Sequence, residues 1–78
     1  MKAFRIICNY FDPPIKSICK ALSPQKARFL CWKSANEAGY SVSFGQLKVC
    51  RAREYDGIKL VSGKCYDEEF VSQQLPTV

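Results

Sequence analysis

Residues 23–39 have the sequence SPQKARFLCWKSANEAG, which contains the clearest helix signals of the chain. Ser23 offers a hydroxyl to a free backbone N–H at the start of a helix, and Pro24 suits the first helical position because its missing N–H has no partner there anyway. Gly39 marks the end, since a glycine just past the last turn readily takes the left-handed conformation. These start and stop signals predict a helix over Pro24–Ala38.

The predicted helix has two faces of different character. Phe29 and Trp32 lie on roughly the side opposite to the small residues, among polar and basic neighbours. Two interpretations stay open. If the face of small residues is buried, both aromatic rings are left for a partner. If the rings are buried instead, Gln25 and Asn36 are drawn toward the core. The face of mostly small residues, which would let the helix lie close to a sheet, consists of Ala27, Leu30, Cys31, Ser34, Ala35 and Ala38.

Upstream of the helix, the sequence predicts two strands that can pair as a hairpin. Apolar and polar side chains alternate from Ala3 to Phe11, which is typical of a strand with one buried face. Asp12-Pro13-Pro14 ends this strand, because two prolines remove two backbone donors. Ile15–Ala21 is a second strand with a less regular pattern.

Downstream of the helix, the sequence predicts further strands. Val42–Phe44 and Leu47–Ala52 are strand-like, and Asp56-Gly57 predicts a hairpin turn that leads into Ile58–Val61. A strand or short helix that contains Cys65, Tyr66, Phe70 and Val71 follows. The run Asp67-Glu68-Glu69 is typical of a helix start or a solvated loop, and residues 75–78 are expected to be loose.

The order strand, strand, helix, strand, strand predicts the fold class. It is typical of a two-layer α+β fold, in which an antiparallel sheet of about four to five strands carries one main helix. A short strand or helix at the C-terminal end completes this expected architecture. We expect residues 1–78 to form a single domain, because the chain has no repeat, linker or low-complexity tract.

Positive charge is concentrated in the first two thirds of the chain. The whole sequence has 12 Lys plus Arg against 7 Asp plus Glu, a net charge of +5. Residues 1–53 hold ten basic and two acidic residues, whereas residues 54–78 hold two basic and five acidic residues. A basic body with an acidic end indicates a partner of negative potential, either nucleic acid or an acidic protein surface.

The composition argues against an enzyme and against a metal or cofactor site. The chain has no histidine, which is the commonest general base and metal ligand. Its five cysteines include no C-x-x-C pair, so we expect neither a metal nor a cofactor. We expect these cysteines to be free, buried thiols in a reducing compartment, and the alternative is a secreted protein stapled by disulfides.

The apolar runs of the sequence are short. None approaches the length of a membrane span, so we expect no membrane partner. Arg5, Asn9 and Asp12 interrupt the first apolar stretch, which argues against a secretory signal. The expected location is therefore the cytoplasm of the host cell.

Two groups of residues are candidate binding sites. Arginine and tryptophan are the residue types that most often anchor protein interfaces. The candidates for a protein partner are Lys20, Lys26, Arg28, Phe29, Trp32 and Lys33. Basic side chains on neighbouring strands would reach nucleic-acid phosphates together. The candidates for this alternative are Lys16, Lys48, Arg51 and Arg53. The sequence contains no nucleic-acid recognition motif, no Gly-rich phosphate loop and no nucleophile with an evident base.

Residues 18–28, with the sequence ICKALSPQKAR, resemble part of a type I-F anti-CRISPR family of phage proteins. In that family a strand runs through an Ala-Ser-Leu-Ser-Gln-Ala-Lys-like stretch into a helix, and a strand hairpin follows. The resemblance implies that Lys20 and Lys26 contact the guide-RNA-bearing surveillance complex. It covers a short part of the chain, and the five cysteines, Pro13-Pro14 and residues 42–53 have no counterpart in it.

Together these patterns predict a small, basic, non-catalytic binding protein. The first hypothesis is a phage or mobile-element inhibitor of a host macromolecular complex, with a CRISPR effector among the targets. Its partner would be a host protein or a ribonucleoprotein complex. The second hypothesis is a protein that binds nucleic acid directly through a basic strand and helix surface. A homodimer is the third.

Overall fold

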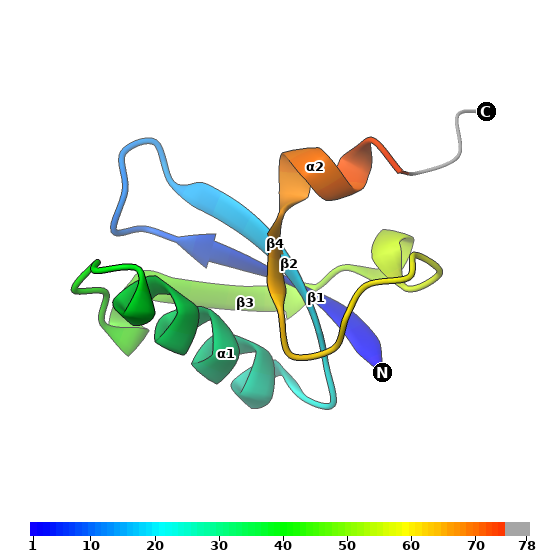
Figure 1. Cartoon of the computed structure of the whole chain (residues 1–78), viewed down its shortest axis with the longest axis horizontal. Coiled ribbons are helices and arrows are strands. Elements are labelled where there is room, and N and C mark those ends of the chain that lie inside the picture. Colours follow the sequence, from blue (N-terminus) through cyan, green and yellow to red (C-terminus); the bar gives the residue numbers. More distant parts are fainter. Residues whose placement is uncertain (75–78) are drawn as a thin grey trace.

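An antiparallel sheet of four strands, in the order β3-β1-β2-β4, forms the centre of the computed structural model (Figure 1). The structure describes residues 1–74, so the expectation for residues 75–78 lies outside the described residues. The elements in chain order are β1 (Lys2–Cys8), β2 (Ile15–Ala21), α1 (Pro24–Glu37), the 3-10 turn η1 (Phe44–Gln46), β3 (Leu47–Arg51), the 3-10 turn η2 (Arg53–Tyr55), β4 (Cys65–Asp67) and α2 (Glu68–Ser72). This confirms the α+β class and the order of the main elements.

The first hairpin forms as the sequence predicts. Strands β1 and β2 pair in antiparallel register from Lys2↔Ala21 to Cys8↔Ile15. β1 ends earlier than expected, and Tyr10 lies beyond the strand. Its ring packs edge-on against Phe11 at a centroid distance of 5.1 Å, so these rings form a small aromatic cluster at the end of the hairpin.

Helix α1 begins and ends where its capping residues indicate. The Ser23 side chain accepts a hydrogen bond from the Lys26 N–H at 3.2 Å. Gly39 has a φ of 98°, in the left-handed region that favours glycine. The Tyr40 N–H then donates to the Ala35 carbonyl oxygen at 3.1 Å, which satisfies one of the last carbonyls of the helix. The helix ends one residue earlier than predicted.

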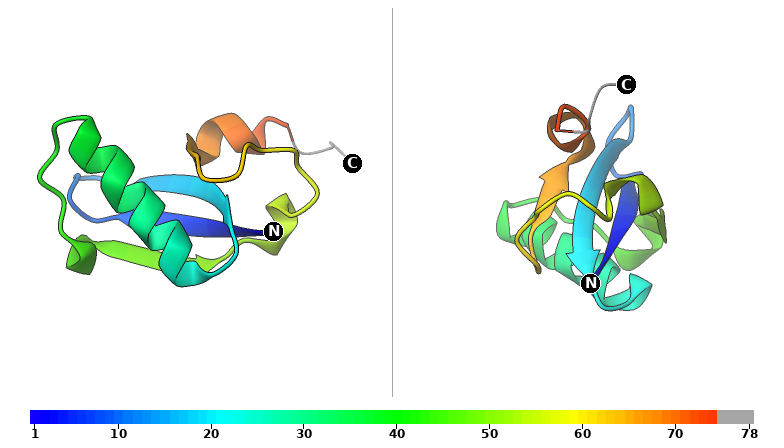
Figure 2. Two further views of the ribbon diagram at one scale, coloured as in Figure 1. Left: turned by 60° about the horizontal axis from the view of Figure 1, so that its bottom comes forward. Right: turned by 90° about the vertical axis from the view of Figure 1, so that its right-hand side faces the viewer.

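The sheet has one apolar cluster on each face, because successive side chains of a strand point to opposite faces. Helix α1 runs obliquely across one face, as Figure 2 shows, and packs Ala27 and Cys31 on Phe4 and Ile6. On the second face, the cluster combines strand residues with residues of η2 and α2. Its buried members are Ala3, Ile18, Ala52, Tyr55 and Val71.

Two predicted strands do not form. Residues 42–44 are no strand, because Ser43 and Gln46 form a capping box that closes η1 locally. Residues 58–61 are no strand either, so the expected hairpin at Asp56-Gly57 is wrong. The Asp56 carboxylate accepts hydrogen bonds from the Ala3 N–H and from Arg51, at 2.9 and 2.7 Å. Asp56 therefore fastens η2 to the sheet instead of starting a hairpin.

The C-terminal segment forms both alternatives that the sequence offered. Cys65–Asp67 is a strand at the sheet edge, and Glu68–Ser72 is a short helix. The Asp67 side chain caps this helix by accepting from the Glu69 N–H at 2.9 Å. Within residues 1–74, neither helix has the length and apolar character that a membrane crossing requires.

Candidate functional site

Three aromatic rings form one continuous surface on α1 and η1. Phe29 and Trp32 are one helical turn apart, so their rings lie on the same side of α1, with centroids 5.9 Å apart. Trp32 stacks on Phe44 of η1 at 4.8 Å, with an interplanar angle of 14°. We call Phe29, Trp32 and Phe44 the aromatic surface.

The three rings differ in burial, and this resolves the two interpretations of the helix. Trp32 is half-buried and packs against the core cluster of the α1 face. Phe29 is 48% exposed and Phe44 is 42% exposed. Trp32 is therefore partly a core residue, whereas Phe29 and Phe44 keep about half of their surface in contact with solvent. Single exposed apolar residues are normal on protein surfaces, but an adjoining set indicates an interaction site.

Arg28 connects α1 to the turn that carries Phe44. Its Nη2 donates to the Phe44 carbonyl oxygen at 2.9 Å. The Nε of Arg28 is buried and has no hydrogen-bond partner within residues 1–74. The guanidinium thus holds η1 beside the helix, and this contact positions the Phe44 ring against Trp32.

Lys26 and Lys33 place positive charge around the aromatic surface. Both side chains are exposed. The Lys33 ammonium lies 3.9 Å from the Glu37 carboxylate, but the two side chains are 60% and 67% exposed, so this pair is weak. Gln25, Lys26, Phe29 and Leu30 line an open hollow of about 350 Å³ beside the rings. A partner with apolar groups and nearby negative charge would fit this arrangement.

Lys20, the remaining candidate for the protein interface, lies elsewhere. Its neighbours Cys19 and Ala21 belong to the α1 face, so the Lys20 side chain points to the second face. The Lys20 Nζ donates to the Asp56 carbonyl oxygen at 2.6 Å. The structure therefore groups the five candidates on α1 and separates Lys20 from them. Phe44 joins this group although the sequence analysis did not select it. A sequence signal for a turn is present there, because Ser43-Phe44-Gly45-Gln46 has the spacing of a capping box.

The four candidates for nucleic-acid binding are also divided. Ile7 of β1 pairs with Lys16 on one side and with Lys48 on the other, so both lysines lie on the second face in one row across the sheet. Arg51 is held by Asp56, with its Nη2 2.6 Å from the carboxylate. Arg53 is exposed on η2. Lys16 and Lys48 thus form a pair, whereas the half-buried Arg51 is occupied by its ion pair with Asp56.

A network of charged residues lies on the second face. Arg5 donates from Nε and Nη2 to the two carboxylate oxygens of Glu68, at 2.8 Å each, and from Nη2 to Glu54 at 2.7 Å. Tyr55 donates its hydroxyl to Glu68 at 3.0 Å. The hydrogen bonding between Arg5 and Glu68 lowers the pKa of the Glu68 carboxyl and raises the pKa of the Arg5 guanidinium. Burial is the main cause that raises the pKa of Tyr55.

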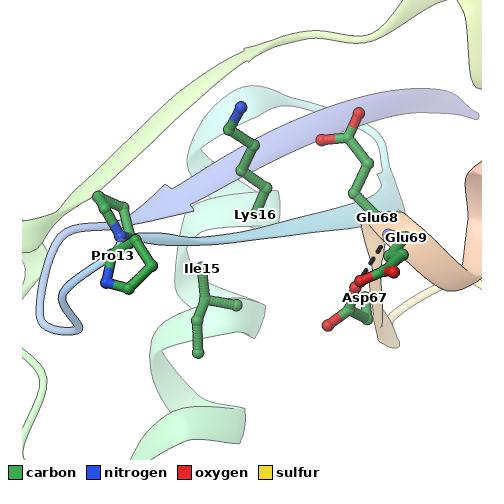
Figure 3. Close-up of a pocket in the computed structure, with 7 residues that line it drawn as sticks. Pro13, Ile15, Lys16, Asp67, Glu68 and Glu69 are labelled. Atoms are coloured by element: carbon green, nitrogen blue, oxygen red, sulfur yellow. Dashed lines mark hydrogen bonds between the residues drawn. The ribbon is translucent and has the colours of Figure 1, made fainter.

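Figure 3 shows the hollow beside this network. Lys16 and Glu68 point to one side of β2, whereas Ile15 points to the other. Pro13 and Pro14 close one end of the hollow, and residues 67–69 close the other. Two of the three acidic side chains that line it have structural roles, since Asp67 caps α2 and Glu68 binds Arg5. This hollow therefore carries no distinct chemistry of its own.

Three cysteines meet between the sheet and α1. Cys19 and Cys31 are buried, Cys65 is half-buried, and all three belong to or pack on the α1-face cluster. Hydrogen bonds from Cys65 lower the pKa of Cys19 and of Cys31 and raise the pKa of Cys65. Cys8 is buried as predicted, but Cys50 is exposed on the second face, which corrects the expectation that every thiol is buried. All five cysteines are free.

No arrangement for metal binding is present in the described part of the chain. Across residues 1–74, no group of three or more Cys, Asp or Glu side chains is placed to hold a metal ion. Comparison of the sequence with protein families and curated proteins, and of the fold with solved structures, finds no match.

Proposed function

We propose that the chain is a non-catalytic binding protein, which docks on an acidic surface of a host protein complex and inhibits that complex. The observation that supports this proposal most is the aromatic surface of Phe29, Trp32 and Phe44 with Lys26 and Lys33 at its edge. Aromatic side chains supply most of the binding energy at protein interfaces, and complementary charge speeds and orients the encounter.

Ion pairs within residues 1–74 leave cations of α1 available to a partner, and they also leave Lys16 and Lys48 on the second face unpaired. Glu54 and Glu68 pair with Arg5, and Asp56 pairs with Arg51. Much of the acidic end of the chain is therefore neutralised on the second face and at its border. Lys26 has no acidic partner within residues 1–74, and Lys33 has only the exposed contact with Glu37. The cations on α1 remain available to an acidic partner.

The resemblance of residues 18–28 selects the first complex to test. It makes the type I-F CRISPR surveillance complex the first candidate target, with Lys26 at the contact. Lys20 points to the opposite face, where it already binds the Asp56 carbonyl group. We therefore assign the docking surface to α1 and η1 and leave Lys20 outside it.

Affinity capture with matched variants tests this proposal. The tagged chain is incubated with nuclease-treated host lysate, and with the purified surveillance complex, and bound protein is quantified. We expect Phe29→Ala combined with Lys33→Glu to lower capture by at least about tenfold, since an anchor residue contributes about 2 kcal/mol or more.

The control variant combines Phe70→Ala with Lys59→Glu. Phe70 is 52% exposed, close to the 48% of Phe29, but lies on α2. Equal capture by the two double variants would contradict the proposed surface. Loss of all capture after nuclease treatment would instead favour nucleic acid as the partner.

A second candidate function rests on the row Lys48, Ile7 and Lys16 on the second face. Two lysines on either side of an apolar residue can hold neighbouring phosphates of a single strand. With two phosphate contacts, the logarithm of the affinity should fall with the logarithm of the salt concentration with a slope of about −1.4. Fluorescence anisotropy with random single-stranded DNA and RNA measures this. Absence of binding at about 0.1 M salt, or unchanged binding by the double variant Lys16→Ala with Lys48→Ala, would exclude this candidate.

A further inference from the structure

Cys65 lies where a three-thiol cluster meets the surface. It is opposite Cys19 in the antiparallel pairing of β4 with β2. Cys31 of α1 packs in the same apolar cluster. Cys19 is 0% exposed and Cys31 is 8% exposed, whereas Cys65 is half-buried. A reagent from solution therefore reaches the cluster first at Cys65.

The pairing of Cys19 with Cys65 is close to the geometry of a disulfide. Directly opposite residues of antiparallel strands have Cβ atoms about 4.5–5.5 Å apart. A disulfide needs a Cβ separation of about 3.5–4.5 Å. β4 is an edge strand that pairs with β2 through three residue pairs, and Figure 2 shows it at the border of the sheet. The two ranges meet at about 4.5 Å, so a small shift of this short strand would bring the two sulfur atoms into bonding distance.

A cavity of about 330 Å³ opens onto Cys65, and the charged residues that line it are net positive. Lys33 and Lys64 line it, with Glu37 as its acidic group. The Lys33–Glu37 contact is long, at 3.9 Å, and both side chains are well exposed. The Lys64 ammonium has no acidic partner within residues 1–74. The cavity therefore favours a small reagent that carries carboxylates.

We propose that Cys65 is a thiol–disulfide exchange site for acidic low-molecular-weight disulfides, represented by glutathione disulfide, and that Cys19 converts the adduct into a Cys19–Cys65 disulfide. In the first step, the neighbouring Cys19 sulfur takes the Cys65 proton as the Cys65 sulfur, the most exposed of the three, attacks the reagent. The reagent's S–S bond breaks, and one glutathione thiol leaves with that proton. In the second step, the Cys19 sulfur attacks the mixed disulfide and a second glutathione thiol leaves. The two cysteines lose two electrons and two protons, and one reagent disulfide becomes two thiols.

The disulfide would fasten the C-terminal arm to the sheet. β4 leads directly into α2, which carries Glu68 of the charged network. The bond would join two segments that are distant in the sequence, and such a cross-link constrains the unfolded chain most. The oxidised protein should therefore unfold at a higher temperature than the reduced protein.

The test treats the reduced, folded chain with glutathione disulfide, blocks the remaining thiols and maps linked peptides by mass spectrometry. We expect a peptide pair joined through Cys19 and Cys65. The variant Cys65→Ser should form no internal disulfide, and Cys19→Ala should accumulate the mixed disulfide at Cys65. Cys50→Ser is the matched control, because Cys50 is exposed and lies outside the cluster, and it should leave the Cys19–Cys65 bond unchanged. Circular dichroism of each variant shows whether it is folded before the reaction.

A second measurement tests the charge of the cavity. Lys64→Glu should slow the reaction with glutathione disulfide by about tenfold at low salt and should not slow the reaction with cystamine, a cationic disulfide. Three results would overturn the proposal. The first is modification of Cys50 while Cys65 stays intact, and the second is an internal disulfide between Cys31 and Cys65 in place of Cys19–Cys65. The third is an equal effect of Lys64→Glu on the rates of reaction with the two reagents.

Discussion

Replacement of Glu68 by Gln tests whether the C-terminal arm is held by the charged network. Glu68 accepts two hydrogen bonds of 2.8 Å from Arg5 and one of 3.0 Å from Tyr55. The side chains of Arg5 and Glu68 are 24% and 19% exposed, so solvent screens the pair in part. A hydrogen bond to a charged group contributes about 1.5–3 kcal/mol when buried, and an exposed ion pair about 0.2–1 kcal/mol. We expect Glu68→Gln to lower the free energy of unfolding by about 1.5 kcal/mol at neutral pH.

The effect of Glu68→Gln should depend on pH. The folded-state pKa of Glu68 lies below its usual value of 4.5 because Arg5 stabilises the carboxylate. The stabilisation by Glu68 is therefore complete above that usual value and is lost as the pH falls through the lower, folded-state pKa. Asp56, whose pKa is lowered by Arg51, acts in the same direction. The difference in stability between the natural chain and Glu68→Gln should shrink in acid.

Urea unfolding, followed by circular dichroism at neutral pH and in acid, measures this difference. Glu69→Gln is the matched control, because Glu69 is the next residue of α2, is exposed, and has no ion pair within residues 1–74. The reasoning is refuted if Glu68→Gln and Glu69→Gln have equal stability at neutral pH. It is also refuted if the deficit of Glu68→Gln stays constant as the pH falls.

Further predictions concern the helix caps, the aromatic surface and the thiols. Ser23→Ala removes the cap of α1 and should lower the free energy of unfolding by about 1 kcal/mol, measured with urea. Gly39→Ala should cost about 1 kcal/mol, because its φ of 98° is strained for other residues although the space around it is open. Trp32→Ala should destabilise the fold by about 2–3 kcal/mol, because Trp32 packs on the core. Phe29→Ala should destabilise it by less than about 1.5 kcal/mol. Thermal unfolding of both variants checks this order. Iodoacetamide should label Cys50 before Cys8 in the folded chain, as peptide mapping would show, because Cys50 is exposed and Cys8 is buried.

Local signals in the sequence predicted the central elements of the fold. Ser23, Pro24 and Gly39 define α1 through backbone chemistry that needs no tertiary contact. The double proline at 13–14 and the apolar alternation before it indicate the first hairpin, and the structure confirms that its two strands pair. These elements follow from interactions between residues that are near in the sequence.

The wrong predictions concern segments in which contacts with other parts of the chain override a local sequence pattern. Asp56-Gly57 is a strong turn pair, but Arg51 and the Ala3 N–H bind the Asp56 carboxylate. The stretch 58–61 has strand-forming residues, yet Ile58 and Leu60 pack against the second cluster without pairing. A single sequence does not show which of two partners a side chain contacts, so these segments were not predictable from pattern alone.

The candidate surface likewise combines residues that local spacing predicts with residues that distant contacts place. Helical spacing predicts that Phe29 and Trp32 lie together, and the structure brings their rings to 5.9 Å. Phe44 joins them through contacts that link α1 to η1, which include the hydrogen bond from Arg28 to the Phe44 carbonyl oxygen and the stacking of Phe44 on Trp32. Lys20 is close in the sequence to Lys26, but strand alternation turns it to the opposite face.

Photo-crosslinking from two positions shows which surface of the molecule docks on the partner. A benzophenone amino acid is placed at position 29 in one variant and at position 70 in another, since Phe29 and Phe70 are 48% and 52% exposed on different helices. In nuclease-treated host lysate, we predict that position 29 crosslinks to an acidic protein and that position 70 does not. Excess natural chain should compete with this crosslink, whereas excess Lys33→Glu should not. Equal crosslinking from both positions, or crosslinking only to nucleic acid in untreated lysate, would contradict the claim that this surface docks on a protein.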